Sequence, residues 1–226
     1  MNPQTRDTGL PAIYAKLFLT ALFWGGTFIA GRHVSQHLDS YSIAFLRFAV
    51  ASALLLALLR IREGRFPRPN REQIARIILL GMTGVFTYNV LFFKGLRLIE
   101  ASRAALIIAT CPAFIAIASI LWLGERLTVG KAIGIPLSML GAVVVISRGE
   151  LRRAVAGQVG WGELFILGCV LSWTAYSLIG RAVMRRLSPL VSVAYSALVG
   201  AVALLVPAMV NGLASNLGRA SLTDWT

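Results

Sequence analysis

Long apolar blocks separated by short polar stretches run along most of the chain. A helix of about 20 apolar residues crosses the hydrocarbon core of a bilayer, and the blocks lack the strict alternation of a membrane strand. The pattern predicts seven transmembrane helices, at residues 12–31, 41–59, 74–93, 104–122, 130–147, 161–179 and 190–210. The fifth block is short and contains Pro136, so its limits are the least sharply defined. The expected fold class is all-α, a polytopic bundle of transmembrane helices.

Composition and charge agree with a membrane protein. Hydrophobic residues make up 57% of the 226 residues and charged residues only 14%, which is too apolar for a soluble domain and too weakly charged for a disordered one. The net charge of +13 is also found in nucleic-acid-binding proteins, but basic loops that orient membrane helices explain it better. Six arginines follow the second block: Arg60, Arg62, Arg65, Arg68, Arg71 and Arg76. We therefore expect a multi-pass inner-membrane protein with this loop and the N-terminus in the cytoplasm.

Signatures of enzymes and metal sites are missing from the sequence. Cys111 and Cys169 lie inside apolar blocks and are expected to be small buried side chains, without a disulfide or metal. His33 and His37 have a spacing that binds metals on a helix, but we expect them in a solvated outer loop. Glu163, near the start of the sixth block, is the carboxylate closest to a membrane interior. We expect no catalytic residue, no metal and no cofactor.

A segment in the first block is repeated in the sixth. Residues 22–34 align with residues 171–183 at an offset of 149, with five of thirteen positions identical, including Trp24 and Trp173. A chance match between apolar segments is the alternative, but the same offset also aligns the second block with the seventh. Because five spans lie in the first unit, the second copy would cross the membrane in the opposite direction, as in transporters with inverted repeats. We expect a first repeat at 1–147, a connecting loop at 148–160 and the start of a second repeat at 161–226, in a chain that lacks three helices of that repeat.

Several short motifs follow one another along the chain. They are Phe23-Trp24-Gly25, Arg47-Phe48, Phe93-Lys94-Gly95-Leu96, Cys111-Pro112, Leu123-Gly124-Glu125-Arg126-Leu127, Leu140-Gly141-Ala142 and Ser188-Pro189. Together they resemble the EamA family of the drug/metabolite transporter superfamily. The resemblance implies an inverted 5+5 helix fold that moves metabolites across the inner membrane, often as an exporter.

Polar residues in the second and third blocks are candidates for substrate binding. Arg47 lies six residues into its block, where it would bind an anionic substrate, pair with a carboxylate, or extend to the outer headgroups. Thr83 and Thr87 share a helix face, next to Tyr88 and Asn89. This face suits a cavity wall, and hydrogen bonding between helices is the alternative.

Proline and aromatic residues provide further candidates. Pro112, with Thr110 beside it, removes a helical hydrogen bond and frees a carbonyl group for a substrate, or forms a purely structural kink. Trp24 and Trp173 would bracket a central cavity, with Tyr176 nearby, or would serve packing alone. The cavity would then favour amphipathic or aromatic substrates.

Small residues recur every four positions in the fifth block, at Gly130, Gly134, Ser138 and Ala142. They permit close helix packing, either within the chain or across a homodimer.

The expected function is a permease or exporter of small metabolites, such as amino acids or drug-like compounds, that works by alternating access. Two alternatives stay open: a non-transporting scaffold or sensor, and an intramembrane enzyme acting on lipids. The expected partners are a small-molecule substrate and the lipid bilayer, and not nucleic acid.

Overall fold

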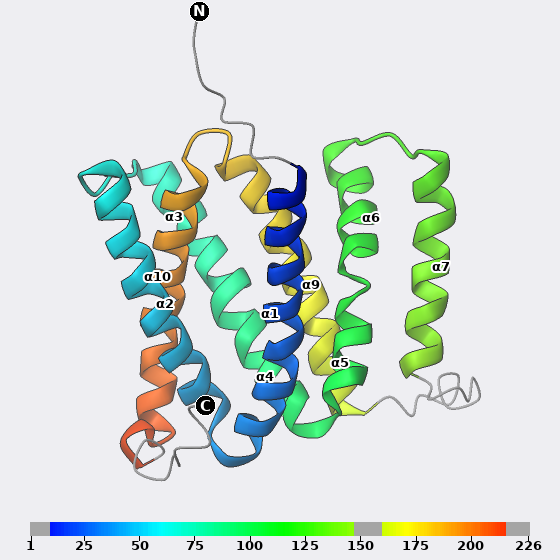
Figure 1. Ribbon diagram of the computed structural model, residues 1–226, viewed down its shortest axis with the longest axis horizontal. Coiled ribbons are helices and arrows are strands. Elements are labelled where there is room, and N and C mark those ends of the chain that lie inside the picture. The colour runs from blue at the N-terminus through cyan, green and yellow to red at the C-terminus, as the bar shows by residue number, and fades with distance from the viewer. Residues whose placement is uncertain (1–9, 147–159, 216–226) are drawn as a thin grey trace, which may run out of the picture.

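The computed structural model describes residues 10–146 and 160–215, in which every regular element is a helix. The helices run up and down beside one another in one bundle (Figure 1). This arrangement confirms the predicted all-α, polytopic fold class. The elements are α1 (Leu10–His37), α2 (Ser40–Glu63), α3 (Arg71–Leu80), the π-helix η1 (Gly81–Thr87), α4 (Tyr88–Leu98), α5 (Ala101–Ile108), α6 (Cys111–Leu123), α7 (Val129–Ile146), α9 (Trp161–Val183) and α10 (Pro189–Val210).

Six helical stretches of the described residues are long and apolar enough to cross a bilayer. They are Leu10–His37, Ser40–Glu63, Arg71–Leu98, Ala101–Leu123, Trp161–Val183 and Pro189–Val210. The remaining predicted span is the fifth, at 130–147, which corresponds to α7; the apolar part of α7, Val129–Val144, is shorter. The predicted connecting loop at 148–160 lies outside the described residues, apart from Gly160. The structure therefore supports a multi-pass membrane protein.

Polar side chains and glycines set the helix ends. The carboxylate of Asp39 accepts hydrogen bonds from the backbone N–H groups of Tyr41 and Ser42 and so caps the N-terminus of α2. Ser188 caps α10 in the same way, with Pro189 in the first turn. Gly124 is the C-cap of α6, with φ +65°.

The third span changes its helical winding in the middle. Seven residues, Gly81–Thr87, form the π-helix η1 between α3 and α4. A Cβ at Gly81 would lie 2.8 Å from the carbonyl oxygen of Ser196, so α10 packs directly against the backbone here. A Cβ at Gly84 would lie 2.2 Å from the ring of Tyr176 on α9. This close approach of two helices accompanies the wider turn, which the sequence pattern did not predict.

The fourth span is interrupted where the sequence places Thr110 and Pro112. Helix α5 ends at Ile108 and α6 begins at Cys111, so Pro112 lies in the first turn of a new helix. The buried hydroxyl of Thr110 donates to the carbonyl oxygen of Ile107 at 2.6 Å. A proline in a first turn lacks only an N–H group that has no helical partner anyway.

The main core lies around α4 and α9. Ile166 of α9 packs against Gly95 of α4, where a Cβ would lie 2.5 Å from the isoleucine side chain. The two cysteines are buried free thiols, as predicted, and the Sγ of Cys169 lies 3.4 Å from the carbonyl oxygen of Tyr88. The largest side chains of this core include Phe92, Phe93, Leu96, Ile107, Ile166 and Val170.

One end of the bundle is joined by a buried ion pair. Arg103 of α5 and Glu163 of α9 lie 2.8 Å apart, and their side chains are 14% and 5% exposed. Arg32 of α1 donates to the carbonyl oxygens of Leu96 and Ile99 at the same end. These contacts join α1 to the C-terminal end of α4, and α5 to α9.

The prediction of an outer loop for His33 and His37 is wrong. Both residues lie in the last turns of α1, with ring centroids 5.0 Å apart. Helix α1 continues beyond the apolar block because polar residues are compatible with helical hydrogen bonding once the chain leaves the hydrocarbon region. Within the described ranges, no cluster of three or more His, Cys, Asp or Glu residues could hold a metal ion.

Helix α7 lies at the edge of the bundle (Figure 1). Gly130 and Gly134 are exposed, and a Cβ at either would meet nothing within 4 Å. Ala142, at the other end of the same stripe, is buried within the chain. A homodimer through Gly130, Gly134, Ser138 and Ala142 stays a prediction.

Candidate functional site

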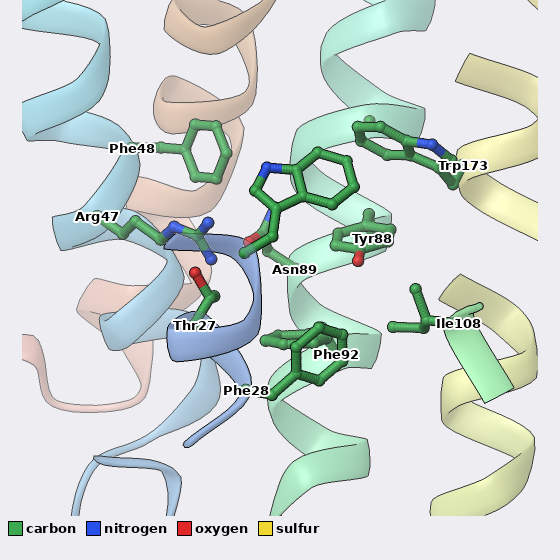
Figure 2. Close-up of a pocket in the computed structure, with 11 residues that line it drawn as sticks. Thr27, Phe28, Arg47, Phe48, Tyr88, Asn89, Phe92, Ile108 and Trp173 are labelled. Atoms are coloured by element: carbon green, nitrogen blue, oxygen red, sulfur yellow. The ribbon is translucent and has the colours of Figure 1, made fainter. Parts of the chain in front are cut away.

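A cavity with two adjoining lobes lies in the middle of the bundle. The first, the Arg47 lobe, has a volume of about 190 Å³ and is lined by residues of α1, α2, η1, α4, α5 and α9 (Figure 2). The second, the Pro112 lobe, measures about 310 Å³ and extends between α5, α6 and α9. Five residues line both lobes: Trp24, Phe28, Tyr88, Ile108 and Trp173. The two lobes therefore form one continuous candidate site.

Aromatic rings form the wall that both lobes share. The rings of Trp24 and Trp173 meet edge to face, with centroids 5.8 Å apart. Tyr88 lies 5.4 Å from Trp173 and stacks on Phe92 at 5.8 Å. Phe28 meets the edge of Phe92 at 5.2 Å. Rings held against one another in this way present a stiff apolar surface to a ligand.

Arg47 supplies positive charge to the cavity. Its side chain points from α2 into the Arg47 lobe, on the side of Thr27 and Asn89 (Figure 2). Its guanidinium lies 5.7 Å from the centroid of the Phe48 ring. In the part of the chain that the structure describes, no carboxylate forms an ion pair with Arg47. An arginine within a predicted membrane span, exposed to the lobe and paired with no carboxylate of the described residues, favours an anionic ligand.

Asn89 supplies an unused hydrogen-bond acceptor. The residue is 2% exposed and lines the Arg47 lobe. Its Nδ2 donates to the carbonyl oxygen of Val85 at 2.8 Å, whereas its Oδ1 has no hydrogen-bond partner among the described residues. A buried acceptor without a donor costs about 1–3 kcal/mol. A ligand with an N–H or O–H group would remove this cost.

The structure brings together six of the ten residues predicted to bind substrate. Those that line the cavity are Trp24, Arg47, Tyr88, Asn89, Pro112 and Trp173. The other four, Thr83, Thr87, Thr110 and Tyr176, do not line either lobe. The binding role of all ten stays a prediction.

Local contacts explain why three of these four lie outside the cavity. The hydroxyl of Thr83 donates to the carbonyl oxygen of Leu79 at 2.7 Å, and the hydroxyl of Thr110 is bonded to Ile107. The ring of Tyr176 packs against Trp173, with centroids 5.1 Å apart. In η1 the wider π turn brings residues five apart onto one face, so that Gly84 and Asn89 both line the cavity.

Ten lining residues are absent from the predicted set: Thr27, Phe28, Phe48, Gly84, Phe92 and Ile108 in the Arg47 lobe, and Ala105, Ala109, Cys111 and Ile115 in the Pro112 lobe. Thr27 had a usable signal, since it lies three positions after Trp24 and therefore on the same helix face. Phe48 also had a usable signal, because it directly follows the candidate residue Arg47 in the sequence. Phe92 and Ile108 are apolar residues in apolar helices, and nothing in their sequence context separates a cavity wall from the core.

A second charged group lies at the end of the bundle that carries the α6–α7 turn. The carboxylate of Glu125 forms ion pairs with Lys131 of α7 at 2.8 Å and with Arg181 of α9 at 2.5 Å. The pKa of the Glu125 carboxyl lies below its ordinary value. The hydrogen bond from Lys131 is the largest cause, and the hydrogen bond from Arg181 is the next largest. The Glu125 of the Leu-Gly-Glu-Arg motif thus connects α7 to α9 instead of facing the cavity.

Comparison with known proteins identifies the family. The model of the EamA-like transporter family matches residues 12–147, which is more than half of the chain. The chain belongs to this family. The predicted resemblance is therefore confirmed, and the EamA match covers every element from α1 to α7.

Curated relatives of this EamA chain are named as transporters. It is 28% identical to the uncharacterized transporter YyaM of Bacillus subtilis over 213 residues, which cover 94% of the chain and 70% of the relative. It is 27% identical to an uncharacterized transporter of Archaeoglobus fulgidus over 203 residues, which cover 89% of the chain and 70% of the relative. It is 32% identical to a probable terminal-alkyne amino-acid exporter of Streptantibioticus cattleyicolor over 213 residues, which cover 90% of the chain and 67% of the relative. These proteins are transporters by name and not enzymes.

Proposed function

We propose that the chain takes part in the export of a small zwitterionic metabolite, an amino acid with an apolar side chain, through the two-lobed cavity. The observation that carries this proposal is a combination of two groups in one aromatic-walled lobe: Arg47, which pairs with no carboxylate of the described residues, and the Oδ1 of Asn89, which accepts no hydrogen bond from them. The name of the relative from Streptantibioticus cattleyicolor, a probable amino-acid exporter, supports the same substrate class.

The two polar groups suit the two ends of an amino-acid head group. The guanidinium of Arg47 would bind the carboxylate through paired N–H groups. The Oδ1 of Asn89 would accept a hydrogen bond from the ammonium group. The apolar side chain would then lie against Trp24 and Trp173 and extend into the Pro112 lobe, whose lining is mostly apolar.

The proposed mechanism is alternating access between two repeats, residues 1–147 and 161–226, connected by residues 148–160. The two tryptophans support it, because they occupy matching positions in α1 and α9 and meet at the cavity. Relative movement of α1 and α9 would change the opening of the site towards each side of the membrane. We place the protein in the inner membrane with a cytoplasmic N-terminus, on the arginine-rich loop between α2 and α3.

Binding of three related compounds tests the head-group assignment. The compounds are leucine, leucinamide, which lacks the carboxylate, and 4-methylpentanoate, which lacks the ammonium group. We expect Arg47→Gln to weaken leucine binding roughly ten- to hundred-fold, since a hydrogen bond to a charged group contributes about 1.5–3 kcal/mol. The same variant should leave leucinamide binding unchanged. Asn89→Leu should weaken leucine binding but not the binding of 4-methylpentanoate.

Arg62→Gln is the matched control, because Arg62 is an exposed arginine on the same helix, outside the cavity. Export of leucine from cells should be reduced in the variants that bind leucine more weakly and unchanged in Arg62→Gln. If Arg47→Gln and Arg62→Gln bind and export leucine equally well, the assignment of Arg47 is wrong.

A further inference from the structure

A second cleft lies apart from the central cavity, at the end of the bundle that carries the α2–α3 loop and the α6–α7 turn. It has a volume of about 550 Å³ and lies between α3, α6 and the end of α9. It shares no lining residue with either lobe of the cavity. Four arginines line it: Arg76, Arg181, Arg185 and Arg186.

Positive charge exceeds negative charge in and around this cleft. Glu125 pairs with Lys131 and Arg181, and Glu72 pairs with Arg76 at 2.5 Å and with Arg186 at 3.1 Å. Four cationic side chains therefore share two carboxylates, and with Arg185 included the positive charges exceed the negative charges by three. Arg185 forms no ion pair with any residue in the described ranges. The excess of positive charge favours binding of an anion in addition to the carboxylates of the described residues.

The cleft also has an apolar wall that faces outwards. Trp122 and Leu123, in the last turn of α6, line it and are 75% and 51% exposed. Leu178 of α9 lines it one turn before Arg181. A tryptophan at the end of a membrane span, next to arginines, is typical of the level of the lipid headgroups. Acyl chains would meet the apolar wall at this level while a phosphate group meets the guanidinium groups.

We propose that this cleft binds the phosphate group of an anionic phospholipid, with Arg181 and Arg185 as the principal ligands. Guanidinium groups bind phosphate oxygens through paired N–H groups, and basic pockets between membrane helices bind anionic headgroups. Inorganic phosphate has the same charged group, but it would leave Trp122 and Leu123 uncovered. A lipid bound here would contact α3, α6 and α9 together and stabilise their packing.

Titration of the purified chain with three probes tests this proposal. The probes are phosphatidylglycerol, phosphatidylcholine and inorganic phosphate at matched ionic strength, and the readout is the fraction of lipid-bound protein in native mass spectrometry. We expect phosphatidylglycerol to bind more tightly than phosphatidylcholine, and inorganic phosphate not to displace it. Arg185→Gln should weaken the binding of phosphatidylglycerol roughly five-fold, and Arg185→Lys should retain most of it.

Arg65→Gln is the matched control, since Arg65 is an exposed arginine at the same end of the bundle but outside the cleft. Arg185 forms no ion pair in the described ranges, so its replacement leaves the Glu125 and Glu72 pairs in place and the variant should fold. Equal binding of phosphatidylglycerol by Arg185→Gln and Arg65→Gln would overturn the proposal. So would equal binding of phosphatidylcholine, or displacement of phosphatidylglycerol by inorganic phosphate, which would identify a site for the free ion.

Discussion

Trp24 of α1 and Trp173 of α9 meet edge to face in the middle of the bundle, with ring centroids 5.8 Å apart. The two residues occupy matching positions in the segments 22–34 and 171–183. Both line the two lobes of the cavity. Residues at matching positions of the two segments thus contribute to one wall of the cavity, as the proposed two-repeat architecture requires.

Replacing Trp173 should weaken the binding of an apolar ligand. Trp173→Ala removes a ring that contacts Trp24, Tyr88 and Tyr176. A leucine side chain against this ring would lose on the order of 40 Å² of apolar burial, which is about 1 kcal/mol, so we expect leucine affinity to fall roughly five-fold. Titration of leucine measures the effect. Trp161→Ala is the control, since Trp161 begins the same helix but is 72% exposed and outside the cavity, and an equal loss in both variants would contradict the prediction.

The helices and the aromatic wall could be predicted because each has a local signal. Apolar blocks located the spans, and the match around Trp24 and Trp173 predicted that the two residues would bracket a central cavity, with packing alone as the alternative. The partners of Arg103 and Glu163 could not be predicted, because the two residues are far apart in the sequence and only the packing of α5 against α9 brings them together. Likewise, nothing in the sequence shows that the Oδ1 of Asn89 has no donor, since this depends on every neighbouring helix.

The π-helix in the third span is another feature with no local signal. Residues 81–87 have the small and apolar composition of an ordinary membrane helix. The wider turn accompanies contacts with other helices, above all the ring of Tyr176 on Gly84 and the side chain of Val199 on Gly81. This tertiary packing also explains why Gly84, and not Thr83 or Thr87, lines the cavity.

Adding one methyl group at Gly84 should destabilise the protein. In Gly84→Ala the new Cβ would lie 2.2 Å from Cδ2 of Tyr176, so the ring or the helix must move. Overpacking of this kind costs about 1–3 kcal/mol, and we expect a lower midpoint of thermal unfolding in detergent. Gly25→Ala is the control, because a Cβ at Gly25 meets nothing within 4 Å and alanine favours the helix. Equal midpoints for the two variants would show that η1 and α9 are not packed this closely.

Breaking the ion pair between Arg103 and Glu163 should strongly lower the stability of the folded protein. Glu163→Ala removes one partner of a largely buried ion pair, a change that costs about 3–5 kcal/mol. Glu72→Ala is the matched control, because Glu72 is 52% exposed and exposed pairs contribute about 0–1 kcal/mol each. Thermal unfolding measures both. The double variant Arg103→Met/Glu163→Leu should recover much of the lost stability, since an apolar pair needs no counterion, and no recovery would argue against the ion pair as the cause.

Lowering the pH should weaken the connection between α7 and α9 through Glu125. Its pKa in the folded protein lies below the ordinary value of about 4.3, because Lys131 and then Arg181 donate hydrogen bonds to the carboxylate. A lowered folded pKa stabilises the folded state above the unfolded pKa, and this contribution is lost as the pH falls through the folded pKa. The difference in unfolding midpoint between the native chain and Glu125→Gln should therefore be present at pH 7 and shrink progressively below about pH 4.3. Lys131→Met, which removes the largest cause of the shift, should reduce this pH dependence, and a difference that stays constant from pH 7 to pH 3 would show that Glu125 does not stabilise the fold through its charge.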